Sequence, residues 1–380
     1  MITQNNEAMG VIFANSYDSL VPELANERLM ASIPFASRYR IVDFMLSSMV
    51  NSGIDNVSLI VRKNYHSLMD HLGSGREWDL SRKNGGLNIV PPFAQKAVNV
   101  YHGRVEAMAS IMGYLKAQKE KYVIMTDANI AVNFDFKAMI AAHEASKADV
   151  TIAYTKERLP EELRELKVSA KDLYYTFDLE DSRIKGIQIN PKDLGEKNLS
   201  MNIYLMEREF LISLLSDAHL QGKHFFERDV IMPRLAEWNV QGFRFDGYVA
   251  RILGSKSYFK ESMKMLDEKN LDALFSPSQI YTKIRDDNPT RYLNGAKAKN
   301  SMVADGCVIE GEVENSILFR GVKVGKGAKV KNSVLMQDTV IGEDTNVEYI
   351  ITDKNVRINH GQTVKGTDTY QVYVPKHKIV

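Results

Sequence analysis

Side chains that could perform chemistry are sparse in this sequence, and most of them stand alone. His66 and His71 lie five residues apart on a polar helical pattern without a third ligand nearby, so we interpret them as surface histidines rather than as a metal site. His360 has the residue type of an acyltransferase base, but a lone histidine without a cofactor-binding extension does not predict that activity. Cys307 is the single thiol of the sequence, which excludes an internal disulfide, and we expect it to be buried.

The hydrophobic pattern up to about residue 255 predicts strands that alternate with helices. Runs of β-branched and other apolar residues predict strands at 8–14, 56–61, 122–126 and 149–155. Apolar residues at spacings of three and four predict helices at 41–53, 105–119 and 136–147. This alternation is typical of a mostly parallel sheet covered by helices. We therefore predict a doubly wound, Rossmann-like α/β domain over residues 1–262.

The sequence repeats itself from about residue 295, where the helical periodicity ends. Small residues stand at Gly311, Ala328 and Thr345. Aliphatic residues recur every 17 positions in three series: Val313, Val330, Val347 and Val364; Ile317, Val334 and Ile351; Val324, Ile341 and Ile358. Such a repeat is close to three hexapeptides, the coil of a left-handed parallel β-helix, with a small residue at each tight corner and an aliphatic one inside. A sandwich of short strands does not account for the constant spacing. We predict the β-helix over 295–380 and a linker over 263–294.

Several motifs resemble those of one enzyme family. The segment RYRIVDFMLSSMVNSGI at 38–54 is similar to RIIDFxLSNxxNSGI of the glucose-1-phosphate adenylyltransferases, which make ADP-glucose for glycogen and starch. HSLMDHL (66–72), SMNIYLMEREFLISLL (200–215) and YIITDKNVRI (349–358) are similar to further family segments in the same order. The resemblance covers essentially the whole chain. It implies a nucleotidyltransferase-like domain followed by a β-helix, and a reaction that joins glucose 1-phosphate to the α-phosphorus of ATP and releases pyrophosphate.

The resemblance also locates the family's catalytic positions, and this chain has replaced their residues. The chemistry needs a glycine-rich turn around phosphates, cations that neutralise charge, and carboxylates that hold Mg²⁺. The three glycines of the turn are replaced by Asn15, Ser16 and Asp18, and two cations are replaced by Leu20 and Met30. The metal carboxylates are replaced by Asn129 and Ile252, and the sugar-phosphate lysine is replaced by Asn190. Side chains on the turn would fill the space of the nucleotide, and Asp18 would repel its phosphates.

These losses together imply that the chain alone is inactive. It is similar to the non-catalytic, regulatory GlgD-type subunits of the family, which pair with a catalytic paralogue. We predict no metal or cofactor bound by this chain, and we expect Mg²⁺ and ATP at the catalytic partner. One alternative is an active transferase with a rearranged site, in which Asp127 replaces the lost carboxylate through a shift of register. A second alternative is a stand-alone sugar-phosphate-binding protein.

Basic residues that remain at family-like positions predict a regulatory site. Lys354 corresponds to the family's activator lysine, with Thr352 as an additional residue before the aspartate, and Arg28 and Arg40 are further candidates. Together they would bind a phosphorylated metabolite between the domains. The alternative for each is a solvated surface charge or, for Arg40, a helical pair with Asp43.

The expected protein partner is the catalytic paralogue, in a heterotetramer. Homo-oligomers are expected when that paralogue is absent, because a β-helix exposes faces and open edges.

The composition excludes other classes of function. The 380 residues carry Lys+Arg 49 against Asp+Glu 48, a formal net charge of +1, so the chain has no overall field that would attract nucleic acid or an anionic membrane. No stretch approaches the roughly 18 consecutive apolar residues of a membrane span. The start, MITQNNEAMG, lacks the basic and apolar regions of a signal peptide. We therefore expect a cytoplasmic protein that binds neither nucleic acid nor membranes.

Overall fold

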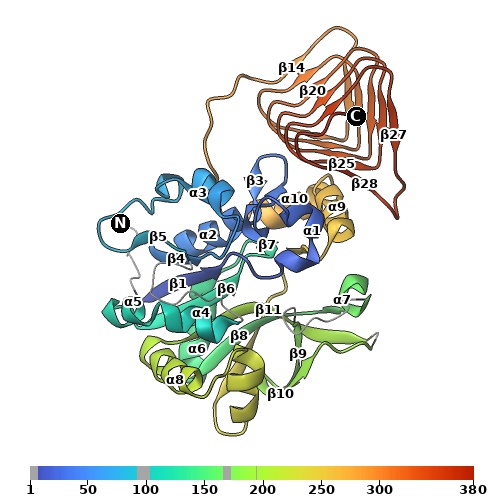
Figure 1. Cartoon of the computed structure of the whole chain (residues 1–380). Coiled ribbons are helices and arrows are strands. Elements are labelled where there is room, and N and C mark those ends of the chain that lie inside the picture. Colours follow the sequence, from blue (N-terminus) through green and yellow to red (C-terminus); the bar gives the residue numbers. More distant parts are fainter. Residues whose placement is uncertain (1–6, 92–102, 166–172, 194) are drawn as a thin grey trace.

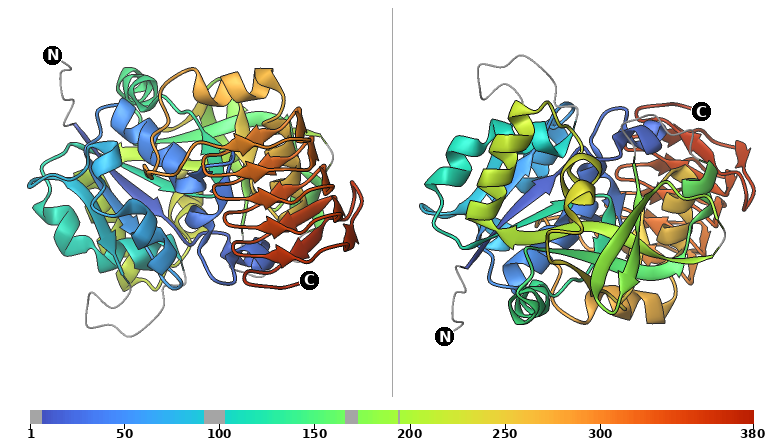
Figure 2. Two further views of the ribbon diagram at one scale, coloured as in Figure 1. Left: turned by 90° about the horizontal axis from the view of Figure 1, so that it is seen from above. Right: turned by 90° about the horizontal axis from the view of Figure 1, so that it is seen from below.

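A computed structural model describes residues 7–91, 103–165, 173–193 and 195–380 of the chain. Its first part is a layered α/β unit, and its second part is a prism of short stacked strands (Figure 1). The coils of the prism lie against one side of the α/β unit, as the two views of Figure 2 show. No helix in these described ranges is both long and apolar enough to cross a membrane.

The α/β unit is built on a nine-stranded sheet. Strand β1 pairs in parallel with β4 on one side and β6 on the other, whereas β11 runs antiparallel between β6 and β8. This arrangement confirms the predicted mostly parallel, doubly wound sheet. From edge to edge the strands are β5 (Gly86–Val90), β4 (Asn56–Ile60), β1 (Ala8–Phe13), β6 (Tyr122–Asp127), β11 (Glu196–Glu207), β8 (Val150–Arg158), β12 (Val240–Arg244), β10 (Arg183–Ile189) and β9 (Tyr175–Glu180).

Helices cover both faces of the sheet. Successive residues of each strand point to opposite faces, so both faces carry apolar side chains that pack against helices. In β1, Ile12 packs into the core under α2 (Ile41–Asn51), α3 (His66–Leu72) and α6 (Phe136–Ser146). Val11 and Phe13 pack into the opposite core, under α4 (Arg104–Ser110), α5 (Met112–Ala117) and α8 (Arg208–Leu220). The prediction of one helix over 105–119 was wrong, because Ile111 leaves helical geometry between α4 and α5.

Smaller elements complete the α/β unit and lead out of it. They are α1 (Pro22–Ala25), β2 (Pro34–Phe35), β3 (Tyr39–Arg40), β7 (Ile130–Val132), α7 (Glu161–Glu165), β13 (Val249–Arg251), α9 (Ser255–Lys264) and α10 (Glu268–Phe275). The chain then runs without regular structure to the first strand of the prism, which begins at Arg291. The domain limits predicted from the sequence, 1–262, 263–294 and 295–380, remain predictions.

The prism is the predicted left-handed parallel β-helix. Its three sheets consist of β14 (Arg291–Tyr292), β17 (Val308–Ile309), β20 (Lys323–Val324), β23 (Val340–Ile341) and β26 (Arg357–Ile358); β15 (Lys297–Lys299), β18 (Glu312–Glu314), β21 (Lys329–Lys331), β24 (Asn346–Glu348) and β27 (Thr363–Lys365); and β16 (Met302–Val303), β19 (Ile317–Leu318), β22 (Val334–Leu335), β25 (Ile350–Thr352) and β28 (Val372–Val374). Each aliphatic series of the sequence forms one row of partners, such as Val313, Val330 and Val347. The predicted repeat is therefore confirmed.

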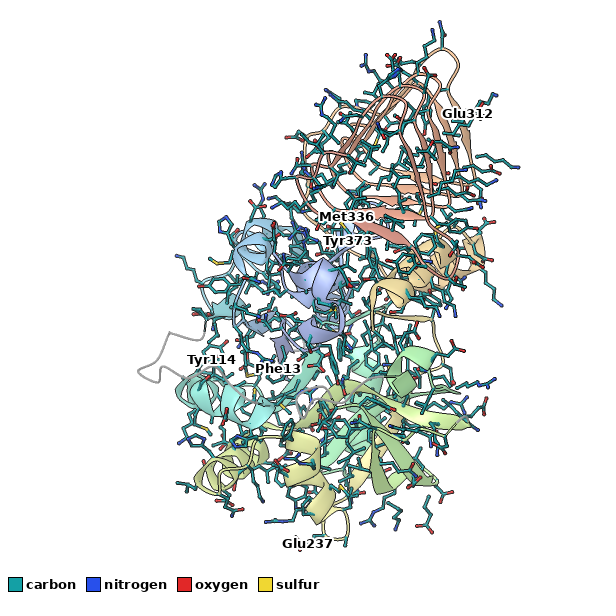
Figure 3. The ribbon with its side chains drawn as sticks, turned by 45° about the vertical axis from the view of Figure 1, so that its right-hand side comes forward. Phe13, Tyr114, Glu237, Glu312, Met336 and Tyr373 are labelled. Carbon is teal, nitrogen blue, oxygen red and sulfur yellow. The ribbon has the colours of Figure 1, made fainter. Side chains whose placement is uncertain are left out.

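One of the three rows does not point into the prism. The rows through Val330 and Ile341 fill its interior, together with the buried thiol of Cys307. The row of Ile317, Val334 and Ile351 instead packs against the α/β unit, in a core shared with α1, α2 and α9. Figure 3 shows Met336 and Tyr373 on this same side of the β-helix, whereas Glu312 points away from it. The two parts of the chain therefore share an apolar interface.

Replacing Gly311 by alanine tests the packing of the β-helix corners. An added Cβ would approach the carbonyl oxygens of Ala328 and Gly325 to 2.3 and 2.7 Å. Because neither backbone atom can move away cheaply, we expect Gly311→Ala to lower the free energy of unfolding by about 1 to 3 kcal/mol in urea melts. Gly113→Ala is the matched control, since a Cβ there meets nothing within 4 Å, and it should cause no loss. Equal stability of the two variants would contradict this packing.

Candidate functional site

The turn that follows β1 is closed by its own side chains. Asn15 Nδ2 donates to Asp18 Oδ2 at 2.7 Å, and Asn15 Oδ1 accepts from the backbone N of Arg62 at 2.5 Å. Asp18 Oδ1 accepts from the backbone N of Met30 at 2.7 Å. Burial raises the pKa of Asp18 to about 6, although these hydrogen bonds act in the opposite direction. The turn that we predicted to replace the family's glycine-rich turn thus contains a carboxylate of its own.

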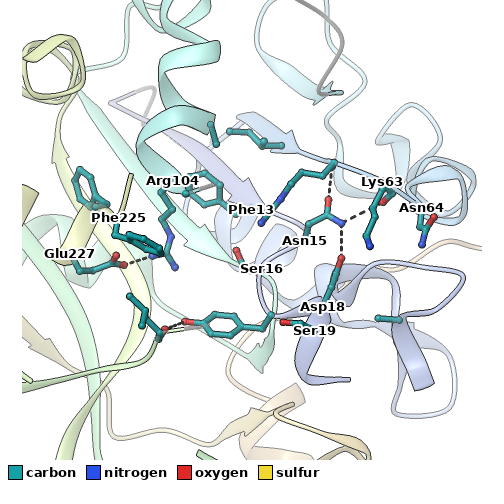
Figure 4. Close-up of a pocket in the computed structure, with 18 of the residues that line it drawn as sticks. Phe13, Asn15, Ser16, Asp18, Ser19, Lys63, Asn64, Arg104, Phe225 and Glu227 are labelled. Carbon is teal, nitrogen blue, oxygen red and sulfur yellow. Dashed lines mark hydrogen bonds and ion pairs between the residues drawn. The ribbon is translucent and has the colours of Figure 1, made fainter. Parts of the chain in front are cut away.

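A cavity of about 660 Å³ lies beside this turn (Figure 4). Asn15, Ser16 and Asp18 line it on the side of the turn, and Arg62 and Lys63 line it after the end of β4. Its aromatic wall is formed by Phe13, Tyr17, Tyr175, Phe225 and Phe226. The cavity is large enough for a small organic ligand.

A buried ion bridge forms part of the cavity wall. Arg104 begins α4, and its two terminal nitrogens contact the carboxylates of Asp127 and Glu227. The hydroxyl of Tyr204 also donates to Glu227. Although burial lowers the pKa of a guanidinium, Asp127 and Glu227 hold the pKa of Arg104 well above its ordinary value. Arg104 therefore stays charged and neutralises the end of β6.

Asn129 and Ile252, which we predicted to stand at the positions of the family's metal carboxylates, lie next to each other. The backbone N of Ile252 donates to the backbone O of Asn129 at 3.1 Å, and both residues are buried. Ile252 packs in the core shared with the β-helix and offers no oxygen ligand from its side chain. Asn129 offers only a neutral amide oxygen. The nearby carboxylate of Asp127 forms an ion pair with Arg104. This set does not fit Mg²⁺, which prefers carboxylate and water oxygens in octahedral geometry.

The other replaced positions have structural roles. Met30 is fully buried, and Leu20 packs beside a small cluster around Leu159. Asn190 accepts from the backbone N of Tyr174 at 2.9 Å and donates its own backbone N to the carbonyl of that residue at 3.0 Å. It therefore holds a turn and is not among the residues that line the cavity.

The three predicted effector residues come together between the domains. Arg28 is only 3% exposed, and its guanidinium contacts Asp353 of the β-helix at 2.5 Å. Arg40 donates to the carbonyl and the hydroxyl of Ser67 at 2.6 and 3.0 Å. Burial and the nearby charges of Arg40 and Arg28 lower the pKa of Lys354 to about 7. Three cations from distant segments thus crowd one interdomain site.

The alternative interpretations of two of these cations were wrong. Arg28 is a buried ion-pair partner rather than a solvated charge. The side chain of Arg40 bonds to Ser67, and Asp43 accepts only the backbone N of Arg40, at 2.9 Å. The carboxylate of Asp43 is occupied elsewhere, by His71 and Thr282.

The prediction that His71 lies on the surface was also wrong, whereas His66 is exposed as predicted. His71 is buried, and its Nε2 lies 2.6 Å from Asp43 Oδ1. Burial lowers the pKa of His71, against the opposing effect of Asp43. The imidazole thus joins α3 to α2 beside the three cations. The sequence carried only a weak signal for this contact, a charged residue inside the otherwise apolar pattern of α2.

The Arg28–Asp353 pair should be a main electrostatic link between the domains. Asp353 also accepts from Tyr373 and from the backbone N of Lys354, so Arg28→Ala would leave a buried, uncompensated carboxylate. We expect this variant to lose about 3 to 5 kcal/mol of unfolding free energy in urea melts. Lys376→Ala, which breaks a partly exposed pair with Glu27, is the control and should cost less than about 1 kcal/mol. Similar losses in both would contradict the assignment.

Comparison with known proteins agrees with these observations. Residues 20–268 match the nucleotidyl transferase family, and residues 284–372 match the GlmU-like C-terminal hexapeptide family. The chain is 33% identical over 365 residues to the glycogen biosynthesis protein GlgD of Bacillus subtilis (strain 168), an overlap of 96% of this chain and 94% of that protein.

Two further relatives extend this likeness. The GlgD protein of Geobacillus stearothermophilus is 35% identical over 330 residues, 86% of this chain and 83% of its own length. The glucose-1-phosphate adenylyltransferase of Thermomicrobium roseum is 33% identical over 354 residues, 92% of this chain and 81% of its own length. The resemblance found in the sequence motifs is thereby confirmed. The chain belongs to the nucleotidyl transferase family, in the group that contains the glycogen biosynthesis protein GlgD and the glucose-1-phosphate adenylyltransferases.

Proposed function

We propose that this chain is a regulatory, catalytically deficient subunit of glucose-1-phosphate adenylyltransferase in glycogen biosynthesis, and that it modulates a catalytic paralogue. The observation that carries the proposal is the pair of adjacent positions at Asn129 and Ile252, where neither side chain supplies a carboxylate. The likeness to GlgD proteins supports the same role. Mg²⁺ and ATP would bind at the catalytic partner, within a heterotetramer.

The charge distribution around the turn also argues against adenylyl transfer by this chain. Attack on the α-phosphorus of ATP spreads negative charge over phosphate oxygens, which cations must stabilise. Here the turn presents the carboxylate of Asp18 and the apolar side chains of Leu20 and Met30. Removing one preorganised contact of this kind typically costs about 10² to 10³ in rate, and several are absent together.

The two alternatives are less well supported. An active transferase would need Asp127 as a metal ligand, but that carboxylate is already paired with Arg104. A stand-alone sugar-phosphate-binding protein would use the same interdomain cations but would need no partner. We prefer the hypothesis of a regulatory subunit because the chain matches a GlgD protein over 96% of its length.

The interdomain site would bind the effector, a phosphorylated metabolite. Lys354 forms no ion pair with any residue in the described part of the chain, and it lies near the charges of Arg28 and Arg40. Such crowding of cations is unfavourable until an anion joins them. Asp353 already pairs with Arg28, so a bound phosphate would mainly compensate the charges of Lys354 and Arg40 and hold the β-helix to the α/β unit.

The proposed division of labour makes a clear prediction for activity. The purified chain alone should form no ADP-glucose above background, because its phosphate turn and metal ligands are lost. A catalytic paralogue from the same organism should be active alone, and the mixture should show raised or effector-shifted activity. Coupled release of pyrophosphate measures all three. Substantial turnover by this chain alone would refute the proposal, and an unchanged rate in the mixture would favour the stand-alone alternative.

The effector site predicts a dependence of binding on pH. Lys354 must be protonated to bind an anion, so affinity for sulfate, whose charge does not change between pH 6 and 8, should fall as pH rises through the Lys354 pKa of about 7. Isothermal titration in buffers of different ionisation enthalpy should detect proton uptake. Lys354→Ala with Arg40→Ala should weaken binding at least about ten-fold. Lys326→Ala, on an exposed corner of the β-helix, should not. Equal heats in all variants would contradict the site.

A further inference from the structure

A second cavity, of about 380 Å³, lies where α9 and α10 meet one corner of the β-helix (Figure 1). Met263 near the end of α9 and Leu266 just after it contribute apolar surface, and Asp267, the residue before α10, contributes a carboxylate. The wall on the β-helix consists of Asn300, Asn315 and Asn332. The cavity therefore combines amides, one carboxylate and apolar side chains from both parts of the chain.

The three asparagines occupy equivalent positions of successive coils. Each follows directly after a strand of one sheet, β15, β18 or β21, and these strands pair in register. Asn300 Nδ2 donates to Asn315 Oδ1 at 2.8 Å, so their amides stack along the β-helix. Among the described residues, neither the amide of Asn332 nor Nδ2 of Asn315 has a hydrogen-bond partner. Since neighbouring strands lie about 4.8 Å apart, this corner presents open amide groups at a regular interval.

The conformation of the turn does not by itself require an amide at these positions. All three asparagines have positive φ angles, of 43, 45 and 46°, which favour asparagine or glycine. The next residue of the same row, however, is Tyr349, with a φ of 51°. Its ring packs against Phe259 of α9, with the centroids 6.3 Å apart. The backbone thus admits another residue type, and the asparagines occupy the part of the row that lines the cavity.

The charged side chains beside the asparagine row are paired with one another. Lys299, Glu314 and Lys331 directly precede the asparagines, and Glu314 contacts the two lysines at 3.8 and 3.4 Å. Asp267 Oδ1 accepts from the backbone N of Lys269 at 2.9 Å and caps α10. A carboxylate at the wall would repel a phosphate. Amides, which both donate and accept, instead match hydroxyl groups, and apolar side chains match a C–H surface.

We propose that this cavity binds a neutral oligosaccharide. Its repeated hydroxyl groups would pair with the row of amides, while one face of a sugar ring would lie on Met263 and Leu266. The volume falls within the range of small-molecule sites. A chain of sugar units is favoured over a single unit, because each coil offers a further amide along the same line. The site would bind its ligand whether or not the chain regulates a partner, since it shares no residue with the cavity beside β1 or with the interdomain cations.

Saturation-transfer NMR of the full-length chain with maltoheptaose, an uncharged glucose oligomer, tests the proposal. Binding should be saturable and should change less than about two-fold on addition of salt, because the ligand carries no charge. Asn315→Gly with Asn332→Gly should weaken binding at least about ten-fold, since glycine keeps the positive φ but removes both amides. Asn355→Gly is the matched control, because Asn355 has a φ of 57° but does not line the cavity, and it should bind as wild type does.

Melting temperatures of the same variants separate a binding role from a purely structural one. If the amides only stabilise the corner, the double glycine variant would lose stability and keep its affinity for maltoheptaose, which would overturn the proposal. Asn332→Asp keeps the size of the side chain but removes its donor, and it should weaken binding even if the double variant folds poorly. Absence of saturable binding to wild type would also overturn the proposal. So would glucose that binds as tightly as maltoheptaose.

Discussion

A buried carboxylate needs a counter-charge or hydrogen-bond donors, and in this protein that need ties together distant parts of the chain. Asp127 and Glu227 share the guanidinium of Arg104 at the cavity. Asp353 of the β-helix contacts Arg28 of the α/β unit. Each of these contacts is made inside the chain, so these buried charges are satisfied internally.

The same constraint shapes two sites. At the cavity, Asp127 and Glu227 pair with Arg104, and the turn after β1 places Asp18 on the wall that also carries Arg62 and Lys63. Between the domains, cations are in excess, and Lys354 has a pKa of about 7 because burial and its neighbours disfavour its charge. The closed turn with Asp18 leaves less room for a phosphate at the cavity, and we propose the interdomain site as the one that binds an anion. An effector bound there would contact both parts of the chain at the apolar interface that joins them.

Local periodicity in the sequence predicted the fold well. The 17-residue repeat identified the β-helix because each coil pairs with the next at a fixed register, as Val330 does with Val347. Periodicity could not indicate which row of side chains points out of the β-helix. The row through Val334 faces the α/β unit, and the residues that bury it are far away in sequence. The break at Ile111 was missed because apolar spacing continues across it.

The sites were predicted less completely than the fold. Family motifs pointed to Arg28, Arg40 and Lys354, which the structure brings together, whereas their assignment of the lost catalytic positions stays a prediction. The motifs could not show that Asp127 is paired with Arg104, because no local pattern links residues of α4, β6 and the turn at Phe226–Ile231. His71 was misplaced for the same reason, as its partner Asp43 lies on another helix. Pairing of buried charges is a property of the tertiary structure.

We propose that this chain contributes no chemistry of its own, even inside a complex. The most direct measurement combines it with a catalytic paralogue whose own metal carboxylates have been changed to asparagine, and follows ADP-glucose formation with Mg²⁺ and effector present. Because every competent site in that complex would have to belong to this chain, we expect no product above background. Sustained ADP-glucose formation by the complex would contradict it.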